Sequence, residues 1–318
     1  MRPVPISAIL LITLAQFAHA GTEPELLPDG NWQDPPPSSA SIQELVASSR
    51  ENMIFFTKGA FDMGDWGPEV NPGGLAFDSA TNSKPLHKVQ LDAFAISKFP
   101  VTYKQFDLFT AAVRLPRINQ EKIAQKYRKP DYPAGVTWQG AKDYCAWLGQ
   151  QANLKMDLPT EAQWEYAARS GGKRHLYATN NGRFEAGRNV PSFADRQSHG
   201  GLVAIDSYPP NPAGIHYMGM LVREWVLDWY GERYYETSPE LNPTGPSQGS
   251  EHVVRGFLGS DTSAMTFQRW AGKDDGQVGS WTAYSGAPTF SKKQIPYTKY
   301  SSSRDSAFRC VVKTDKPL

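Results

Sequence analysis

Neither sign of charge is in excess in this sequence, and cysteine and long apolar runs are nearly absent. Lys and Arg number 33 against 32 Asp and Glu, so the net charge is close to zero. A neutral balance argues against nucleic acid or an anionic membrane as the main partner, because both select basic surfaces. Beyond the first 20 residues no segment is apolar enough to cross a bilayer. We therefore expect no nucleic-acid partner and no direct membrane span.

The motifs that mark common cofactor and metal sites are missing as well. The sequence has no P-loop, no Gly-x-Gly-x-x-Gly after a strand and no His-Glu-x-x-His. Its histidines beyond residue 20 are scattered, with no pair at helical spacing, so zinc or non-haem iron is not indicated. They are His87, His175, His199, His216 and His252. We expect them to pack in loops or to lie at the surface.

The N-terminus has the pattern of a cleaved export signal. Arg2 precedes a short apolar run at residues 8–17, and residues 18–20 read Ala-His-Ala, the small-x-small pattern that signal peptidase cuts. The run is shorter than a membrane-spanning helix, which needs about 20 residues, so an uncleaved anchor is the weaker alternative. We therefore expect cleavage after Ala20 and a periplasmic mature protein.

The remainder of the chain indicates one large domain that is poor in regular elements. Residues 21–50 are rich in Pro, Gly and Ser and predict an extended leader, within which 41–49 can form a short helix. Strand patterns occur at 53–56 and 89–96. With 27 Gly, 25 Pro and 9 Trp in the chain, the domain at 51–318 is expected to be loop-rich and held together by aromatic packing.

Two helices are predicted in the middle of the chain. The first follows Thr137, a good N-cap residue, and its apolar residues recur at i, i+3, i+4 and i+7 to form one face. These are Ala141, Tyr144, Cys145 and Leu148. The second starts at Thr160 within Thr-Glu-Ala-Gln, a capping-box pattern in which Gln163 reaches back to the N-cap amide, and it ends before Gly171.

The two cysteines are Cys145 and Cys310. In an exported protein a small and even number of cysteines favours a disulfide, with a reactive thiol or a metal-binding pair as the alternative. Such a bridge would close a loop of more than 160 residues. The chain-entropy account of disulfides then gives roughly 4–5 kcal/mol of stabilisation.

Charged and aromatic residues gather at 223–225 (Arg-Glu-Trp) and at 228–230 (Asp-Trp-Tyr). Such a cluster can line a binding pocket or form a buried ion pair in an aromatic core, and we favour the core. Glu161 and Glu165 stand four residues apart on the second predicted helix, as an acid and a base catalyst can. The simpler interpretation is that the helix dipole favours a carboxylate at Glu161, in the first turn.

A longer series of motifs resembles the formylglycine-generating enzyme family, also called the sulfatase-modifying factor domain. The strongest is Leu-Pro-Thr-Glu-Ala-Gln-Trp-Glu-Tyr-Ala-Ala-Arg at 158–169. The others stand in family order: Gly-Ala-Phe-Asp-Met-Gly at 59–64, Lys-Phe-Pro-Val-Thr at 98–102, Tyr-Cys-Ala-Trp-Leu at 144–148, Ser-Tyr-Pro-Pro-Asn at 207–211, Arg-Glu-Trp-Val-Leu-Asp-Trp-Tyr at 223–230, Asn-Pro-Thr-Gly-Pro at 242–246, Val-Arg-Gly at 254–256 and Ala-Phe-Arg-Cys at 307–310. The resemblance covers about residues 53–312. It implies a mixed α/β fold with little regular secondary structure, related to the C-type lectin core, and a structural disulfide between Cys145 and Cys310.

The sequence departs from the family where the family binds copper. In the enzymes two cysteines follow an Arg-Gly-Gly-Ser motif and bind copper(I); counted without gaps from Arg255, their positions fall on Asp261 and Thr266. No cysteine lies between 146 and 309. Because copper(I) is soft and needs thiolates, the resemblance implies that formylglycine generation and copper binding are lost.

The calcium ligands of the family have changed too. A Gly-Asn pair that supplies ligands in the family reads Met220-Leu221 here, which leaves only Glu224. Calcium takes about six to eight oxygen ligands, so this site is expected to be lost. Residual calcium would have to use Asn189 and Asp195, a remnant of the second site of the family. We therefore expect no resident cofactor.

Two exported branches of the family lack the copper cysteines, and they imply two different functions. TagR-like proteins are accessory to type VI secretion and act through protein partners upstream of a threonine kinase. PvdO-like proteins are associated with oxidation of the pyoverdine chromophore. Because the chain offers no redox centre, we favour the first branch. The expected partner is then an outer-membrane lipoprotein, the periplasmic domain of a kinase or a secreted effector.

The alternative is a periplasmic oxidoreductase in which Arg255 stabilises developing negative charge on the substrate. A third interpretation is a lectin-like groove that binds glycan. The candidate pocket for these functions consists of Arg223, Glu224, Trp225, Arg255, Asp261 and Thr266.

Overall fold

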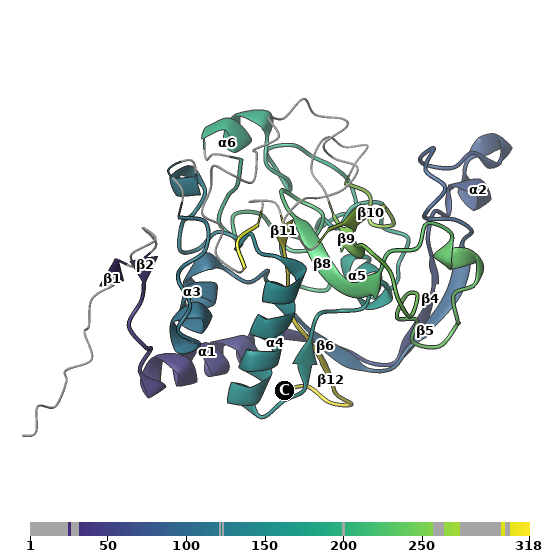
Figure 1. The fold of residues 1–318 in the computed structure, drawn as a ribbon. Coiled ribbons are helices and arrows are strands. Elements are labelled where there is room, and N and C mark those ends of the chain that lie inside the picture. Colours follow the sequence, from purple (N-terminus) through teal and green to yellow (C-terminus); the bar gives the residue numbers. More distant parts are fainter. Residues whose placement is uncertain are drawn as a thin grey trace, which may run out of the picture.

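Short helices and strands alternate along the chain with longer irregular connections (Figure 1). The computed structural model describes residues 25–26, 32–120, 122, 124–198, 201–256, 264–273, 300–302 and 306–318. The helices are α1 (Ser39–Glu51), α2 (Gly67–Val70), α3 (Tyr103–Ala112), α4 (Trp138–Ala152), α5 (Glu161–Ala168) and α6 (Phe193–Ser198), with 3-10 turns η1 (Pro72–Gly74), η2 (Ala124–Lys126) and η3 (Tyr234–Glu236). The strands are β1 (Glu25–Leu26), β2 (Trp32–Gln33), β3 (Met53–Phe56), β4 (Gly59–Met63), β5 (His87–Leu91), β6 (Phe94–Ser97), β7 (Met156–Asp157), β8 (Arg223–Trp229), β9 (His252–Arg255), β10 (Arg269–Gly272), β11 (Ser306–Ala307) and β12 (Val311–Lys313).

Two four-stranded sheets form the framework of this mixed α/β fold. One has the strand order β3-β6-β12-β7 and the other β10-β9-β8-β11. Neighbouring strands in them are antiparallel except β8 and β11, which are parallel. Because β12 pairs with both β6 and β7, a late segment of the chain completes a sheet that starts at β3 (Figure 1). A hairpin of β4 and β5 extends from the body with α2 at its far end. Among the described residues, no helix combines the length and the apolar character needed to span a membrane.

The two helices predicted in the middle of the chain are α4 and α5. Thr137 caps α4, and its Oγ1 accepts a hydrogen bond from the amide of Gly140 at 3.1 Å. At α5 the capping box is complete: Thr160 Oγ1 accepts from the amide of Gln163 at 3.2 Å, and Gln163 Oε1 accepts from the amide of Thr160 at 2.9 Å. Such N-caps contribute about 1 kcal/mol each. Because these bonds are local, the sequence alone predicts both helix starts.

The strand predicted over 89–96 is in fact two strands. β5 pairs with β4, whereas β6 pairs with β3 and β12, and Asp92 and Ala93 separate the two. The alternation of apolar residues runs through this break. Such an alternation indicates which residues are buried. It does not indicate that residues 87–91 and 94–97 pair with different strands.

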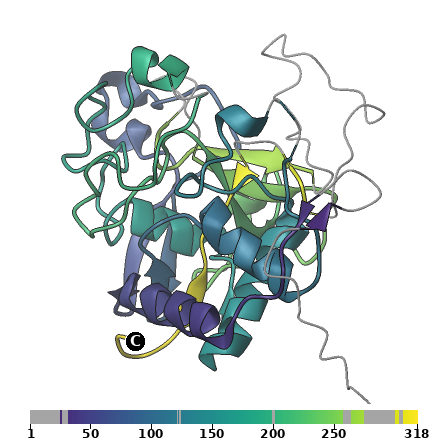
Figure 2. The same ribbon diagram turned by 90° about the vertical axis from the view of Figure 1, so that its left-hand side faces the viewer.

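The leader expected over 21–50 is helical from Ser39 onward. Ser38 caps α1 through its side-chain oxygen, and Leu45 is buried against the core. α1 packs alongside α4, as Figure 2 shows from a second direction. α1 therefore packs against the domain that is expected from residue 51 onward. The short helix expected at 41–49 is thus present, and it extends two residues further at each end.

A disulfide crosses the core between α4 and β12. Cys145 on α4 and Cys310 just before β12 are bonded with their Cα atoms 5.6 Å apart, and both residues are fully buried. Aromatic rings pack beside it: the ring of Tyr144 lies 5.8 Å from that of Phe106 and 5.4 Å from that of Phe308. The predicted bridge is confirmed, and it joins segments 165 residues apart.

Replacing both cysteines, Cys145→Ala with Cys310→Ala, should lower the free energy of unfolding by about 2–5 kcal/mol, as the loss of a native disulfide does. Urea unfolding followed by tryptophan fluorescence measures the difference. A reductant present during unfolding serves as the matched control, because it should destabilise the wild type and leave the double variant unchanged. A double variant as stable as the oxidised wild type would contradict the structural role of the bond.

Candidate functional site

A cluster of buried arginines and glutamates lies between α5 and the strands β9 and β10. Arg255 on β9 donates from Nη1 to Oε1 of Glu161 at 2.7 Å and from Nη2 to Oε2 of Glu165 at 2.8 Å. Arg269 on β10 donates to both carboxylate oxygens of Glu161, at 2.7 and 2.8 Å. Arg169, just after α5, donates from Nη1 to Oε1 of Glu165 at 2.9 Å. We call these five residues the buried ion-pair cluster.

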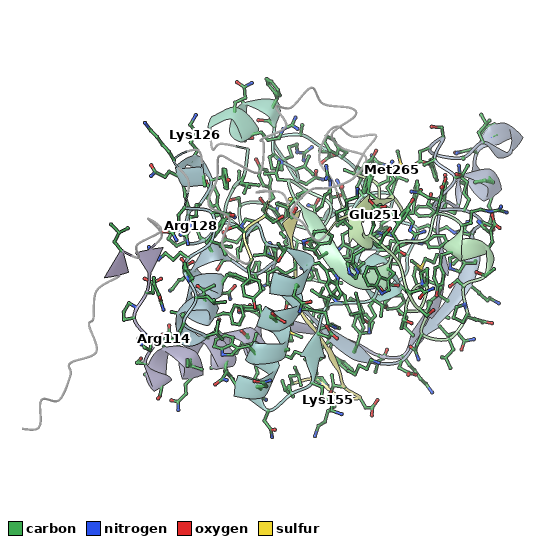
Figure 3. All side chains as sticks on the ribbon, viewed as in Figure 1. Arg114, Lys126, Arg128, Lys155, Glu251 and Met265 are labelled. Carbon is green, nitrogen blue, oxygen red and sulfur yellow. A yellow bond between two sulfur atoms is a disulfide. The ribbon has the colours of Figure 1, made fainter. Side chains whose placement is uncertain are left out.

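Water does not reach the buried ion-pair cluster. Its side chains are at most 2% exposed. Charges removed from water in this way are tolerated only when each is paired and hydrogen-bonded. α5 supplies both glutamates because residues four apart lie on the same helix face. The cluster thus holds α5 against β9 and β10, in a region densely filled by side chains (Figure 3).

The pKa values of two neighbouring buried carboxyl groups are shifted in opposite directions. Burial raises the pKa of Glu161, but the charges of Arg269 and Arg255 outweigh burial and hold this pKa below its usual value. Burial and the nearby charge of Glu161 raise the pKa of Asp228 to about 8. Oδ2 of Asp228 also accepts a hydrogen bond from the amide of Glu161 at 2.8 Å. Glu161 is therefore ionised at neutral pH, whereas Asp228 keeps its proton.

Glu224 on β8 belongs to a second buried ion pair. Arg309 donates to both of its carboxylate oxygens, from Nη2 to Oε1 at 2.6 Å and from Nε to Oε2 at 2.7 Å. The indole Nε1 of Trp164 donates to Oε2 of Glu224 at 2.9 Å. Because Arg309 directly precedes Cys310, this ion pair and the disulfide hold the same segment of the chain.

The candidate pocket predicted from the sequence is part of the core. Five of its residues are at most 3% exposed: Arg223, Glu224, Trp225, Arg255 and Thr266. Asp261 lies outside the described residues. The indole Nε1 of Trp225 donates to the carbonyl of Val136 at 2.8 Å, and the hydroxyl of Thr266 donates to the carbonyl of His175 at 2.8 Å. The buried core that was favoured for residues 223–225 is what the structure shows, since β8 buries consecutive residues rather than alternate ones. The described residues of the candidate pocket are therefore closed to solvent.

The sequence did not indicate which arginines pair with these buried carboxylates. They are Arg169, Arg269 and Arg309. Arg169 and Arg309 stand inside the family motifs at 158–169 and 307–310, which was the one available signal. Nothing in the sequence around Arg269 points to its role.

The residues expected to hold residual calcium serve hydrogen bonds within the protein. Asn189 is buried, and its Nδ2 donates to the carbonyl of Arg183 at 3.1 Å. Oδ2 of Asp195 accepts from the hydroxyl of Tyr208 at 3.0 Å. Residues 220–221, where the family has calcium ligands, are apolar core. In the part of the chain that the structure describes, no three His, Cys, Asp or Glu side chains are grouped to hold a metal ion.

His252 differs from the loop or surface histidine that the sequence predicts. It lies on β9, is 2% exposed, and its ring lies 3.7 Å from the rings of both Trp138 and Trp229. Burial lowers the pKa of His252 to about 4. The ring is therefore neutral at physiological pH and acts as part of the aromatic core.

A cavity of about 370 Å³, here called the loop cavity, opens between the segments around residues 129–132, 195 and 203–208. Of the residues singled out from the sequence, Asp195 lines it and those of the candidate pocket do not. Burial and the hydrogen bond to Asp195 raise the pKa of Tyr208 to about 12, so the phenol keeps its proton and donates it. Ser207 and Tyr208 belong to a family motif at 207–211, and Asp195 was considered only as a calcium ligand, so neither indicated a cavity here.

The sequence and the fold are similar to those of known proteins. The family model of the sulfatase-modifying factor enzyme 1-like domain matches residues 39–293. The serine/threonine-protein kinase pkn1 of Chlamydia pneumoniae is 35% identical over 210 residues, which make up 60% of this chain and 31% of the kinase. The formylglycine-generating enzyme of Mus musculus is 32% identical over 256 residues, with 64% of this chain and 65% of the enzyme covered. The chain thus spans less than a third of the length of the kinase.

Among solved structures, PvdO from Pseudomonas aeruginosa superimposes with a TM-score of 0.59 and 20% sequence identity. The match covers 82% of this chain and 94% of PvdO. At this identity the likeness concerns the fold alone.

Asp228→Asn and Glu161→Gln should have different effects on stability. Folding raises the pKa of Asp228 from the usual 3.8 to about 8, so the wild type loses stability as the pH rises between these values, by up to about 1.4 kcal/mol per pH unit. Asparagine has no proton to lose and keeps an oxygen for the amide of Glu161, so this variant should be more stable than the wild type at pH 8. Glu161→Gln leaves two buried arginines short of a partner and should cost about 3–5 kcal/mol.

Urea unfolding at pH 5 and at pH 8 measures both variants against the wild type. The advantage of Asp228→Asn should grow from the lower to the higher pH, whereas the loss in Glu161→Gln should persist at both. If Asp228→Asn is less stable than the wild type at pH 8, Asp228 is ionised in the folded protein and the assignment of the proton is wrong.

Proposed function

Because the chain belongs to the sulfatase-modifying factor enzyme 1-like family, we propose that it is an exported, non-catalytic member that binds a protein partner and regulates an envelope system. The proposal rests on the observation that the chain has no free thiol. The sequence has two cysteines, and both are used in the buried disulfide between Cys145 and Cys310. The chain therefore has no thiolate to offer copper(I), on which formylglycine generation in this family rests.

The surroundings of Thr266, one of the two positions aligned with the copper cysteines, support the same conclusion. Its hydroxyl donates to the carbonyl of His175, and its own carbonyl accepts from Nη2 of Arg255. Both the side chain and the backbone at this position are thus engaged inside the core, where a substrate does not reach them.

The kinase relatives favour a regulatory role linked to phosphorylation. In the Chlamydia pneumoniae kinase the matching region is one part of a longer chain. For this protein we propose a place upstream of threonine phosphorylation in type VI secretion, as in TagR-like proteins. The partner is then an outer-membrane lipoprotein, the periplasmic domain of a kinase or a secreted effector. The signal pattern at residues 1–20 would deliver the domain to that compartment.

The alternative, an oxidoreductase that matures the pyoverdine chromophore, needs a basic group facing its substrate. Arg255 was the residue considered for this role. It is fully buried and donates to Glu161, to Glu165 and to the carbonyl of Thr266. An arginine held in this way does not face a substrate, so the arrangement favours binding over oxidation.

Co-purification from the native host tests the proposal. The mature protein (residues 21–318) is tagged, cross-linked mildly in intact cells and isolated from the envelope, and its companions are identified by mass spectrometry. We expect one envelope protein in stoichiometric amount, and lower threonine phosphorylation of a secretion component in a strain that lacks the gene.

The control for this experiment is the same tag exported alone behind residues 1–20. A partner found with both baits is a contaminant of the tag. Recovery of a siderophore precursor or its chromophore, without any stoichiometric protein, would overturn the proposal in favour of the oxidoreductase.

A further inference from the structure

The loop cavity is built from three separate segments of the chain. Lys129, Asp131 and Tyr132 come from the loop that precedes α4, Asp195 from α6, and residues 203–208 from the segment that follows α6. Its volume of about 370 Å³ is at the lower end of the range of ligand pockets and suits one or two side chains rather than a large cofactor.

Hydrogen bonds within the protein connect the walls of the loop cavity in the absence of a ligand. The amide of Ile205 donates to the carbonyl of Asp131 at 3.2 Å, and the hydroxyl of Tyr208 donates to Oδ2 of Asp195 at 3.0 Å. Behind the wall, the hydroxyl of Tyr217 donates to the carbonyl of Val203 at 3.1 Å. A site whose walls are already in position loses little conformational freedom when it binds.

Tyr217 shows how firmly this wall is held. Its φ is 70°, in the left-handed region that a bulky aromatic residue rarely adopts. The residue is 2% exposed, and its hydroxyl also accepts from the amide of Val203 at 3.4 Å. Both backbone groups of Val203 are therefore bound to one side chain, which fixes the wall of the cavity.

The lining favours a positively charged ligand. The lining contains two carboxylates, of Asp131 and Asp195, and one ammonium, that of Lys129. Two phenol rings, of Tyr132 and Tyr208, add electron-rich faces that attract cations. The Nζ of Lys129 itself lies 5.2 Å from the ring centroid of Tyr132, so an alkylammonium already occupies part of this surface in the free protein.

We propose that the loop cavity receives a lysine or arginine side chain of the protein partner. This inference rests on the proposed function and names the chemistry by which the partner is recognised. The incoming cation takes the place of Lys129 over Tyr132 and is attracted by Asp131 and Asp195. Phe193, on the same helix α6 as Asp195, is 67% exposed and provides apolar contact area of the kind that surrounds such anchors at protein interfaces.

Short peptides test the charge preference without any knowledge of the partner. The probes are acetyl-Gly-Gly-Lys-Gly-Gly-amide and the same peptide with Glu in place of Lys, titrated into the mature protein at low salt and followed by NMR shifts. The Lys peptide should bind, more weakly as salt rises. Asp131→Asn should weaken it about two- to five-fold, and Lys129→Gln should tighten it by a similar factor, as single exposed charges do.

Two features keep these variants interpretable. Asparagine at Asp131 retains the backbone carbonyl that binds Ile205, so the wall stays fastened. Asp315→Asn removes an exposed carboxylate that does not line the cavity, and it should leave the peptide affinity unchanged. Equal effects of the two substitutions would mean that only the net charge of the protein matters and would overturn the inference.

Other outcomes separate the inference from the proposed function. Preferred binding of the Glu peptide, abolished by Lys129→Gln, would make the cavity an anion site and overturn the inference. Free lysine that binds as tightly as the peptide would make it a site for small amines, which also overturns it. If the wild type and the double variant Asp131→Asn, Asp195→Asn capture a partner equally well, the inference is wrong. The proposed function is then unaffected. Peptide binding as predicted, with no envelope partner recovered, would uphold the chemistry of the cavity and overturn the proposed function.

Discussion

The pairing of Arg255 with Glu161 and Glu165 joins β9 to α5 in the middle of the core. It brings a strand residue to a helix that lies 90 to 94 residues earlier in the chain, in a core closed to water. A buried charge is stable only while its partners remain, so α5, β9 and β10 must keep their positions together. The protonated Asp228 beside Glu161 and the second pair of Glu224 with Arg309 extend the same constraint toward the disulfide.

This constraint also keeps the buried charges apart from the charged groups that line the loop cavity. Arg255 and Glu224 have the side chains that catalysis uses, yet each is hydrogen-bonded to protein groups and hidden from solvent. The groups that can meet a ligand lie instead on loops, around the cavity bounded by Lys129, Asp131 and Tyr208. A rigid core that carries long loops is an arrangement suited to binding.

The sequence predicted those features that depend on neighbouring residues. The caps at Thr137 and Thr160 are local, and the α4 and α5 helices follow from them. The disulfide followed from compartment and from family resemblance. The partners of Glu161 could not be read in this way, because Arg255 and Arg269 stand 94 and 108 residues further along the chain.

For a related reason, the sequence could not show whether the candidate pocket is open or buried. A run of charged and aromatic residues looks the same whether it lines a cleft or fills a core. Only the tertiary partners, such as Trp164 and Arg309 on Glu224, show that β8 is buried. The loop cavity could not be predicted from the sequence, because only tertiary contacts bring its three segments together. These contacts join Asp131 to Ile205 and Asp195 to Tyr208.

We propose that this member of the family binds a partner and does not generate formylglycine. A direct measurement is to incubate the mature protein (residues 21–318) with copper(I), oxygen and a cysteine-containing sulfatase peptide, and to follow the peptide by mass spectrometry. With both cysteines held in the disulfide, the account predicts a peptide whose cysteine is unchanged, whereas an active family enzyme converts it under the same conditions. Conversion of the cysteine to formylglycine by this protein would contradict the account.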